Sequence, residues 1–463
     1  MSSIKSSQKP HLHVAVAPNA GMGHLTPFLQ LASMLLSRGL MVTLVTAEST
    51  VSLAESNYLA HFLKTHQEIK HVEFEVISFH SSNSTIDDVF FLQYDNISRS
   101  THLLKPLLSS SSPPLSAIYC DLSLAAGVAN IAADLTIPFY VLFVSSAKFA
   151  CLSLHLPSLL SKPDILSSEP TDQVEIPGLT RLPISSIPLP LLNPNRILSQ
   201  LVLSGVGVLS EAKGILINSF DWFEAETFAA LNNGSVVSNL PPFLPVGPLK
   251  SHEPERDQSQ CLPWLDNQPA ESVIYVSFGS RNALSSDQIR ELRDGLVKSG
   301  FRFLWILKTH IVDKDDKQDL KDLLGDSFFI RTKERGLVVR NWVNQQEILA
   351  HPAIGGFVSH CGWNSVLEAA YQGVPVLAWP QGGDQMINAE VVQKAGLGIL
   401  EKNWGMGFKR LVKEEEIASK IVQVMEDAEL RSRAKRVGEE ARKATEFGGN
   451  SEKAIGRVIE QLG

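Results

Sequence analysis

Short apolar runs rich in β-branched and aromatic residues alternate with helical patterns along almost the whole chain, and this alternation constrains the fold more than any other feature. Strands that alternate with helices favour parallel sheets with helices packed on both faces. The alternation occurs twice, so we expect two such sheets. The strands predicted for the first half are 12–17, 41–46, 72–79, 116–121 and 139–144, and those predicted for the second half are 273–278, 301–307, 336–342, 355–360 and 375–380.

A proline-rich and charged stretch separates the two halves. Residues 240–269 show little periodicity of either kind, which is typical of a linker. From residue 414 onward the pattern is helical, and GGNS (448–451) interrupts it before a last helix that Asn450 or Ser451 is expected to cap. We therefore predict an α/β protein with Rossmann-like domains over 1–245 and 271–445, a linker over 246–270, and a C-terminal helix over 446–463 that packs back on the first domain.

The composition argues against several classes of protein. The 41 Lys and Arg residues against 49 Asp and Glu give a net charge of −8 with no basic patch, so we expect no nucleic-acid partner. The four cysteines show no C-x-x-C spacing, which indicates neither a disulfide framework nor a zinc site. The N-terminal segment is polar and no window approaches about 18 uninterrupted apolar residues, so we expect a cytoplasmic chain without membrane insertion.

The most informative motif is HCGWNSVLEAA, residues 360–370. A strand ends at His360, Gly362 lets a ligand approach the backbone, and a helix follows, so unpaired N–H groups and the positive helix end favour a phosphate. Asn364 and Ser365 can cap the helix or reach phosphate oxygens. If the helix begins promptly, Glu368 lies on one stripe with His360 and Asn364, two turns below the phosphate, where a carboxylate suits a ribose diol.

Residues on either side of this motif complete a nucleotide-sugar pattern. Trp342 ends a predicted strand, where its ring could stack on a base, and Asp384 and Gln385 follow another strand, where they could bind sugar hydroxyls. Each residue also has a simpler interpretation. Trp342 and Trp363 could be core aromatics, Asn364 only a helix cap, and Glu368 a solvated helix residue.

Taken together, the 44 residues from Trp342 to Gln385 resemble the signature box of plant family-1 UDP-sugar-dependent glycosyltransferases, which modify small molecules. The matching positions are Trp342, Gln345, His351, His360, Gly362, Trp363, Asn364, Ser365, Glu368, Gly373, Pro375, Pro380, Asp384 and Gln385. The resemblance extends over the rest of the chain. It implies the GT-B fold, in which an N-terminal acceptor domain and a C-terminal donor domain face each other across a cleft.

The resemblance also implies roles for the donor residues. Uracil would be held by Trp342 and the Val343 backbone, and ribose by Gln345 and Glu368. The diphosphate would be bound by His360, Asn364, Ser365, Ser280 and Arg281, and the sugar by Trp363, Asp384 and Gln385. The final Gln is the family's usual choice for glucose, which makes UDP-glucose the expected co-substrate, with no other cofactor and no metal. Asn344 replaces a proline common in the family, and we expect it to loosen the turn beside the uracil.

The stretch AGMGHLTP (20–27) resembles a dinucleotide loop only weakly. Gly21 and Gly23 fit a G-x-G-x-x-G pattern, but Thr26 replaces the third glycine, and Glu48 stands at a plausible distance for a ribose carboxylate. This match supports the alternative of an NAD(P)-dependent oxidoreductase. If the nucleotide instead binds the second domain, His24 is free to take part in the chemistry.

Transfer from a UDP-sugar needs no general acid, because the leaving group is already good, but a phenolic acceptor needs a base. A positioned imidazole can take the phenolic proton, and a carboxylate partner fixes its tautomer. Asp121, at the end of a predicted strand, can be that partner. A structural role for His24 and a helix cap for Asp121 are the simpler alternatives. The family resemblance implies that the two form its catalytic dyad.

Within the plant family, stretches such as SFGSRNALS and FLWILKTHIVDKDD look most like those of flavonoid C-glucosyltransferases. These enzymes act on polyhydroxylated aryl ketones such as 2-hydroxyflavanones and phloretin-like dihydrochalcones, and the expected product is a β-C-glucoside. Loss of a phenolic proton also places charge on the ortho carbon, so an O-glucosyltransferase with the same dyad remains an alternative. The candidate acceptor residues, for which core packing is the competing interpretation, are Met22, Phe91, Tyr94, Phe149 and Gly383.

Two further alternatives are a catalytically silent binder of nucleotide sugars and a metal-dependent transferase that uses Asp313 and Asp315 as a D-x-D site. The intact His24 and Asp121 argue against the first. The mixed charges around Asp313 indicate a solvated loop instead of a metal site. We expect a metal-independent, inverting and monomeric enzyme.

Overall fold

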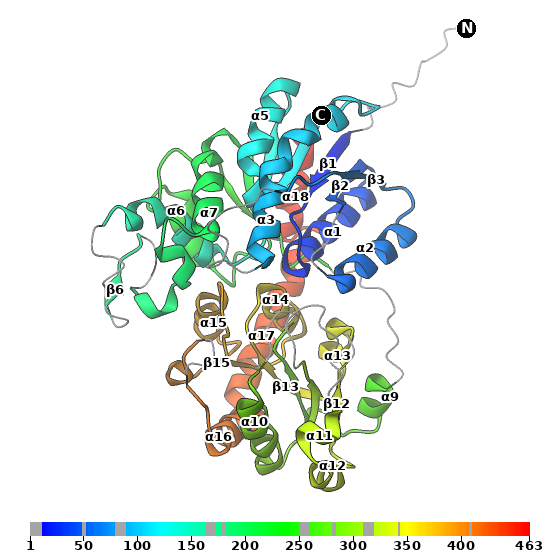
Figure 1. The fold of residues 1–463 in the computed structure, drawn as a ribbon, viewed down its shortest axis with the longest axis vertical. Coiled ribbons are helices and arrows are strands. Elements are labelled where there is room, and N and C mark those ends of the chain that lie inside the picture. Colours follow the sequence, from blue (N-terminus) through cyan, green and yellow to red (C-terminus); the bar gives the residue numbers. More distant parts are fainter. Residues whose placement is uncertain are drawn as a thin grey trace.

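The computed structural model consists of two α/β lobes stacked along the long axis of the molecule (Figure 1). It describes residues 12–48, 52–78, 89–162, 172–177, 179, 181–250, 260–279, 284–308, 319–340, 343–406 and 410–463. Figure 1 shows the N-terminal lobe, coloured blue to green, above the C-terminal lobe, coloured green to red; the last helix of the chain, also red, lies in the upper lobe.

The N-terminal lobe is built on a seven-stranded parallel sheet in the order β3-β2-β1-β4-β5-β8-β9. Its strands are β1 (His13–Ala17), β2 (Met41–Ala47), β3 (Lys70–Phe74), β4 (Ala117–Asp121), β5 (Phe139–Phe143), β8 (Gly214–Ile217) and β9 (Phe243–Pro245). The main helices are α1 (Met22–Ser37), α2 (Leu53–Thr65), α3 (Val89–Arg99), α4 (Leu104–Ser109), α5 (Ala125–Leu135), α6 (Ala147–Leu160), α7 (Ile197–Gly207) and α8 (Ala225–Asn232). A short antiparallel pair, β6 (Gln173–Val174) and β7 (Leu182–Pro183), lies beside them.

The C-terminal lobe contains a six-stranded parallel sheet in the order β12-β11-β10-β13-β14-β15. Its strands are β10 (Val273–Ser277), β11 (Arg302–Ile306), β12 (Gly336–Val339), β13 (Ile354–Ser359), β14 (Val376–Ala378) and β15 (Gly398–Leu400). Its helices are α9 (Cys261–Asp266), α10 (Ser286–Ser299), α11 (Leu320–Leu324), α12 (Asp326–Thr332), α13 (Gln345–Ala350), α14 (Trp363–Gln372), α15 (Gln385–Lys394), α16 (Glu414–Glu426) and α17 (Ala428–Thr445). Every residue of β1, β4, β5, β10 and β13 is buried, as expected for strands covered by helices on both faces.

The last helix, α18 (Asn450–Glu460), returns to the N-terminal lobe (Figure 1). Its apolar residues Ala454, Ile455 and Val458 join the same buried cluster as Val14 and Val16 of β1. Gly449 occupies the N-cap position. The expected side-chain cap is wrong, because the Asn450 amide donates to Asp221 instead and the Ser451 hydroxyl donates to the Gly247 carbonyl.

The structure differs from the strand predictions in several places. β3 ends at Phe74 and β12 at Val339, both earlier than expected, while β8, β9 and β15 were not predicted. The expected linker contains helix α9. The missed strands are three or four residues long, and such short segments are defined by their pairing with a neighbouring strand more than by their own periodicity.

Three observations bear on the classes considered from composition. All four cysteines are buried and unbridged. Within the described residues, no helix has the length and apolar character needed to cross a bilayer. Over the same part of the chain, no group of three His, Cys, Asp or Glu side chains could hold a metal ion, and Asp313 and Asp315 lie outside it.

Candidate active site

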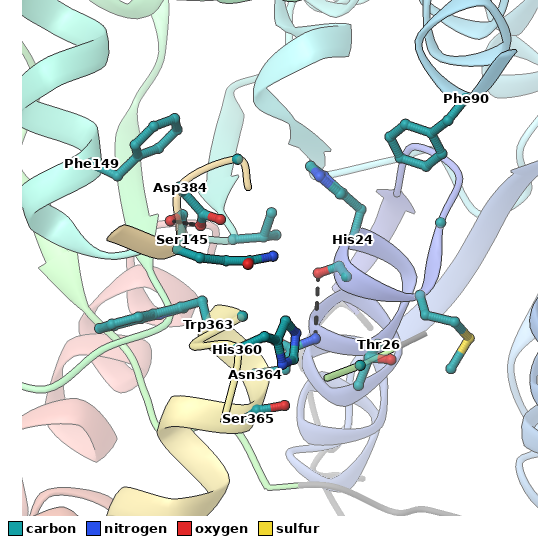
Figure 2. A pocket seen from close by; sticks show the side chains of 18 of the residues that line it. His24, Thr26, Phe90, Ser145, Phe149, His360, Trp363, Asn364, Ser365 and Asp384 are labelled. Carbon is teal, nitrogen blue, oxygen red and sulfur yellow. Dashed lines mark hydrogen bonds between the residues drawn. The ribbon is translucent and has the colours of Figure 1, made fainter. Parts of the chain in front are cut away.

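A cleft of about 390 Å³ lies between the two lobes, at the carboxyl ends of both sheets. Its walls come from segments that follow β1, β4 and β5 in the N-terminal lobe and β10, β11, β13 and β14 in the C-terminal lobe. Figure 2 shows side chains from both lobes converging on it, with His24 on one side and His360, Trp363 and Asp384 on the other. Open α/β sheets bind ligands at this edge.

His24 lies in the first turn of α1 and is paired with Asp121 at the end of β4. The His24 Nδ1–H donates to Asp121 Oδ2 over 2.6 Å, and the two side chains are 31% and 3% exposed. The other carboxylate oxygen, Oδ1, accepts from the Ser123 N–H at 2.9 Å and the Ser123 hydroxyl at 2.6 Å. Asp121 thus serves both as a helix cap and as the partner of His24.

The electrostatics keep Asp121 ionised. Burial acts to raise the pKa of its carboxyl group, but the charge of His24 and the hydrogen bonds from His24 and Ser123 outweigh burial and hold that pKa below its ordinary value. The Tyr94 ring packs edge-on against the imidazole, with ring centroids 4.9 Å apart. Asn19 in turn donates to the Ser123 hydroxyl at 2.7 Å. The imidazole is therefore held in one orientation with Nε2 left for a ligand.

The glycine loop before α1 does not present its first N–H to a ligand. Gly21 has a φ of 94°, which favours glycine, and its N–H donates to the buried Glu55 carboxylate at 2.7 Å. Glu48 is exposed and its backbone pairs with Phe74 at the end of β3. The Gly21 N–H is therefore occupied, and Glu48 does not line the cleft, so the structure does not favour a dinucleotide in this loop.

On the opposite wall, the HCGWNS segment links β13 to α14. Because α14 begins at Trp363, His360 precedes the helix, and only Asn364 and Glu368 share one helical face. Burial lowers the pKa of His360 to about 4, so its imidazole is neutral near pH 7. A Cβ atom at either Gly279 or Gly362 would lie 2.5 Å from its Nε2, so both neighbours must be glycine for the ring to fit.

A set of polar side chains lies beside the helix start. Gln345 donates to Glu368 at 2.6 Å and lies 2.8 Å from the Ser365 hydroxyl. Asn344 is buried, and its side chain accepts the Glu347 N–H and caps α13. Trp342, in the turn beside the uracil site, lies outside the described residues, so the expected loosening of that turn stays a prediction. Val343 is also buried and lines the cleft.

The Trp363 side chain is packed between the two lobes. The indole is 3% exposed, its N–H donates to the Asn218 carbonyl of the other lobe at 2.7 Å, and it packs near Phe223. Asp384 Oδ2 accepts from the Ser145 hydroxyl (Figure 2) and also from the Asn388 amide. Gln385 Oε1 accepts the Gln381 and Gly382 N–H groups, which leaves its NH₂ to donate elsewhere.

Aromatic and aliphatic side chains make up much of the cleft lining. The five candidate acceptor residues, Met22, Phe91, Tyr94, Phe149 and Gly383, all line the cleft, and their role toward an acceptor stays a prediction. The lining residues that sequence reasoning missed include Phe90, Leu201, Val202 and Ser145 in the N-terminal lobe and Lys308 in the C-terminal lobe. The i, i+4 spacing of Phe90 and Tyr94 on α3 was a usable signal, whereas nothing in the sequence places α7 against α3.

Three predicted donor residues, Ser280, Arg281 and Trp342, lie outside the described residues. The other ten predicted donor residues all line the cleft: Val343, Gln345, His360, Gly362, Trp363, Asn364, Ser365, Glu368, Asp384 and Gln385.

Comparison with known proteins agrees with this geometry. A family model described as "UDP-glucoronosyl and UDP-glucosyl transferase" matches residues 239–431. UDP-glycosyltransferase 708G2 of Citrus unshiu is 46% identical over 458 residues, covering 97% of this chain and 96% of that protein. The chain belongs to the UDP-glycosyltransferase family.

Solved structures extend this result to the fold. The glycosyltransferase matches LpCGTa in complex with UDP with a TM-score of 0.85 and 42% identity, over 98% of this chain and 99% of that one. It matches Medicago truncatula UGT71G1 complexed with UDP-glucose with a TM-score of 0.86 and 27% identity, over 98% of each chain. The family resemblance and the GT-B fold are therefore confirmed. The protein is a glycosyltransferase with a UDP-sugar donor and a small-molecule acceptor.

Proposed function

We propose that this glycosyltransferase transfers glucose from UDP-glucose to an aromatic carbon of a polyhydroxylated aryl ketone, with inversion at the anomeric carbon. The observation that carries the proposal is the His24–Asp121 pair, held at 2.6 Å in one lobe and facing a polar helix start in the other lobe. A base on one wall and a nucleotide-sugar site on the other are the two parts that direct transfer requires.

The donor would lie along the C-terminal wall. Glu368, oriented by Gln345, is placed to accept both ribose hydroxyls, and the first N–H groups of α14 point toward the diphosphate together with His360 and Ser365. Uracil would lie against Trp342 and the Val343 backbone.

The sugar would meet three groups. Asp384 accepts from its hydroxyls, and the Gln385 NH₂ donates to them. Trp363 would contribute its backbone N–H, because its indole N–H is bonded to Asn218.

His24 supplies the base. Its Nδ1–H is bonded to Asp121, so Nε2 carries the lone pair that takes the phenolic proton of the acceptor. The electron pair released moves into the ring, and the ortho carbon attacks the anomeric carbon as the bond to the UDP oxygen breaks. UDP leaves with that bonding pair. The ring carbon then gives its own proton to water, and protonated His24 returns the phenolic proton to the ring oxygen, which restores aromaticity.

The acceptor half of the cleft suits an aryl ketone. Phe90, Phe91 and Phe149 offer flat apolar walls, while the described polar groups at the acceptor end include His24 and Ser123. Support for carbon attack comes from the sequence resemblance to flavonoid C-glucosyltransferases. The similarity to LpCGTa over almost the whole chain supports the same assignment.

The test is product analysis with UDP-glucose and phloretin. Mass spectrometry should find one added hexose in a product that survives hot acid and β-glucosidase, and NMR should place the anomeric carbon on a ring carbon in the β configuration. A product that hot acid or β-glucosidase hydrolyses would instead establish O-glucosylation. Absence of transfer to phloretin, 2-hydroxyflavanones and related phenols would refute the acceptor class.

A further inference from the structure

Asn388 of α15 joins three segments that meet beside the cleft. Its side chain is fully buried, although it lies one helical turn after Asp384. Its NH₂ donates to Asp384 Oδ2 at 2.9 Å and to the Cys361 carbonyl at 3.2 Å. Its Oδ1 accepts the Ser146 hydroxyl at 2.8 Å. Both amide hydrogens and the amide oxygen are therefore in use.

The partners of Asn388 belong to different parts of the site. Cys361 has a φ of 65° between His360 and Gly362, so its carbonyl direction is set by an unusual backbone conformation in the diphosphate segment. Ser146 belongs to the N-terminal lobe, where its hydroxyl also accepts the Phe149 N–H and caps α6. One amide thus connects the donor segment, the Asp384 carboxylate and the acceptor lobe.

The contact between the lobes continues on both sides of Asn388. The Ser145 hydroxyl donates to Asp384 Oδ2 (Figure 2), and Lys148 forms an ion pair with Glu390 in which the two side chains are 8% and 10% exposed. Among the described residues, both bonds to the Asp384 carboxylate end on Oδ2. This arrangement leaves Oδ1 to a ligand and fixes the plane of the carboxylate.

We infer that Asn388 is a positioning residue for sugar recognition, which holds the Asp384 carboxylate in one orientation and ties it to the acceptor lobe through Ser146. This inference rests on the proposed function, in which Asp384 accepts hydrogen bonds from the sugar. The sugar site is then complete only when α6 and α15 are in contact. UDP carries no sugar, so its binding does not depend on the bond between Asn388 and Ser146.

Asn388→Asp tests the inference with almost no change in size. The new carboxyl group still accepts from Ser146, but it loses the amide donor to the Cys361 carbonyl and places a second carboxylate against Asp384, which raises the pKa of the pair and disturbs the orientation of Asp384. We expect KM for UDP-glucose to rise about tenfold or more, the effect of losing a hydrogen bond to a charged group, while Kd for UDP changes less than about threefold. Asn232→Asp controls for the loss of two amide donor bonds, because the exposed Asn232 donates to the Phe228 and Phe243 carbonyls, and none of these three residues lines the cleft.

A second pair of variants covers the case in which Asn388→Asp fails to fold. Ser146→Ala removes the hydrogen bond between Ser146 and Asn388 and should raise KM for UDP-glucose relative to Kd for UDP, whereas Ser146→Thr keeps the hydroxyl and should restore the ratio. The inference is overturned if the ratio is unchanged in these variants, or if UDP affinity falls in parallel with KM. Lack of any wild-type turnover would refute the proposed function, whereas wild-type turnover with an unchanged ratio refutes this inference alone.

Discussion

Asp121→Asn should abolish most turnover while leaving the shape of the site intact, and the hydrogen bonds explain why. Oδ1 of Asp121 accepts from two donors, the Ser123 N–H and hydroxyl, so the NH₂ of an asparagine cannot occupy that position. The NH₂ must therefore face His24 Nδ1, which then becomes the acceptor. The imidazole is forced to carry its proton on Nε2, the atom that should take the phenolic proton.

The expected loss is the whole contribution of the general base, about 10²- to 10⁴-fold in kcat. This corresponds to about 3–5 kcal/mol in the activation free energy. The assay compares kcat with UDP-glucose and phloretin for wild type, Asp121→Asn and Ser123→Ala, with Kd for UDP measured alongside. Ser123→Ala keeps the carboxylate on His24 and should lose less than about tenfold, since only one neutral donor is removed.

Acceptor acidity provides an internal check on the reasoning. A more acidic phenol needs less help from a base, so the deficit of Asp121→Asn should shrink as the acceptor pKa falls. If Asp121→Asn retained about a third or more of wild-type turnover, or if its deficit did not depend on acceptor acidity, the assignment of His24 as the base would be refuted.

Four further outcomes are expected. Burial lowers the pKa of His360 in the folded protein to about 4, below its ordinary value of 6.5, so the unfolded chain binds the proton first as pH falls. The free energy of unfolding should therefore decline between about pH 6.5 and 4, by up to about 3 kcal/mol. In urea titrations His360→Gln should show a smaller decline over the same range. Gly279→Ala should weaken UDP binding by about tenfold or more in calorimetry, because the new Cβ would lie 2.5 Å from the His360 ring and the backbone φ is 77°. Gly382→Ala is the control and should bind UDP normally, because a Cβ there would have no neighbouring atom within 4 Å. Phe90→Ala should raise acceptor KM by about tenfold without changing Kd for UDP, since it removes one aromatic wall. Turnover should persist in EDTA; loss that Mg²⁺ restores would contradict the proposed metal-independent mechanism.

The donor side of the cleft could be predicted from the sequence because its residues lie within one short box. The strand, the glycine and the helix start around His360 are contiguous, so local patterns indicate both their structure and their chemistry. The pairing of His24 with Asp121 was expected from the family resemblance, since the sequence alone does not show that β1 and β4, about 100 residues apart, are neighbours in the sheet.

Contacts between the lobes could not be predicted in this way. The Trp363 indole bonds to Asn218 across 145 positions, and Asn388 reaches Ser146 across 242. No local periodicity encodes such pairs, because they depend on how two separately folded sheets are oriented. Strands β9 and β15 were not predicted for the same reason. Each has three residues and forms by pairing with the edge of a sheet.

The return of α18 to the first lobe sets an order on biosynthesis. Residues 454–458 complete an apolar layer that β1 and α1 share, so the part of the layer that α18 covers stays exposed while the whole second lobe is being made. A ribosome adds about 5–20 residues each second, which leaves that part open to chaperones or to other nascent chains for tens of seconds. The first lobe to emerge is thus the last to be finished.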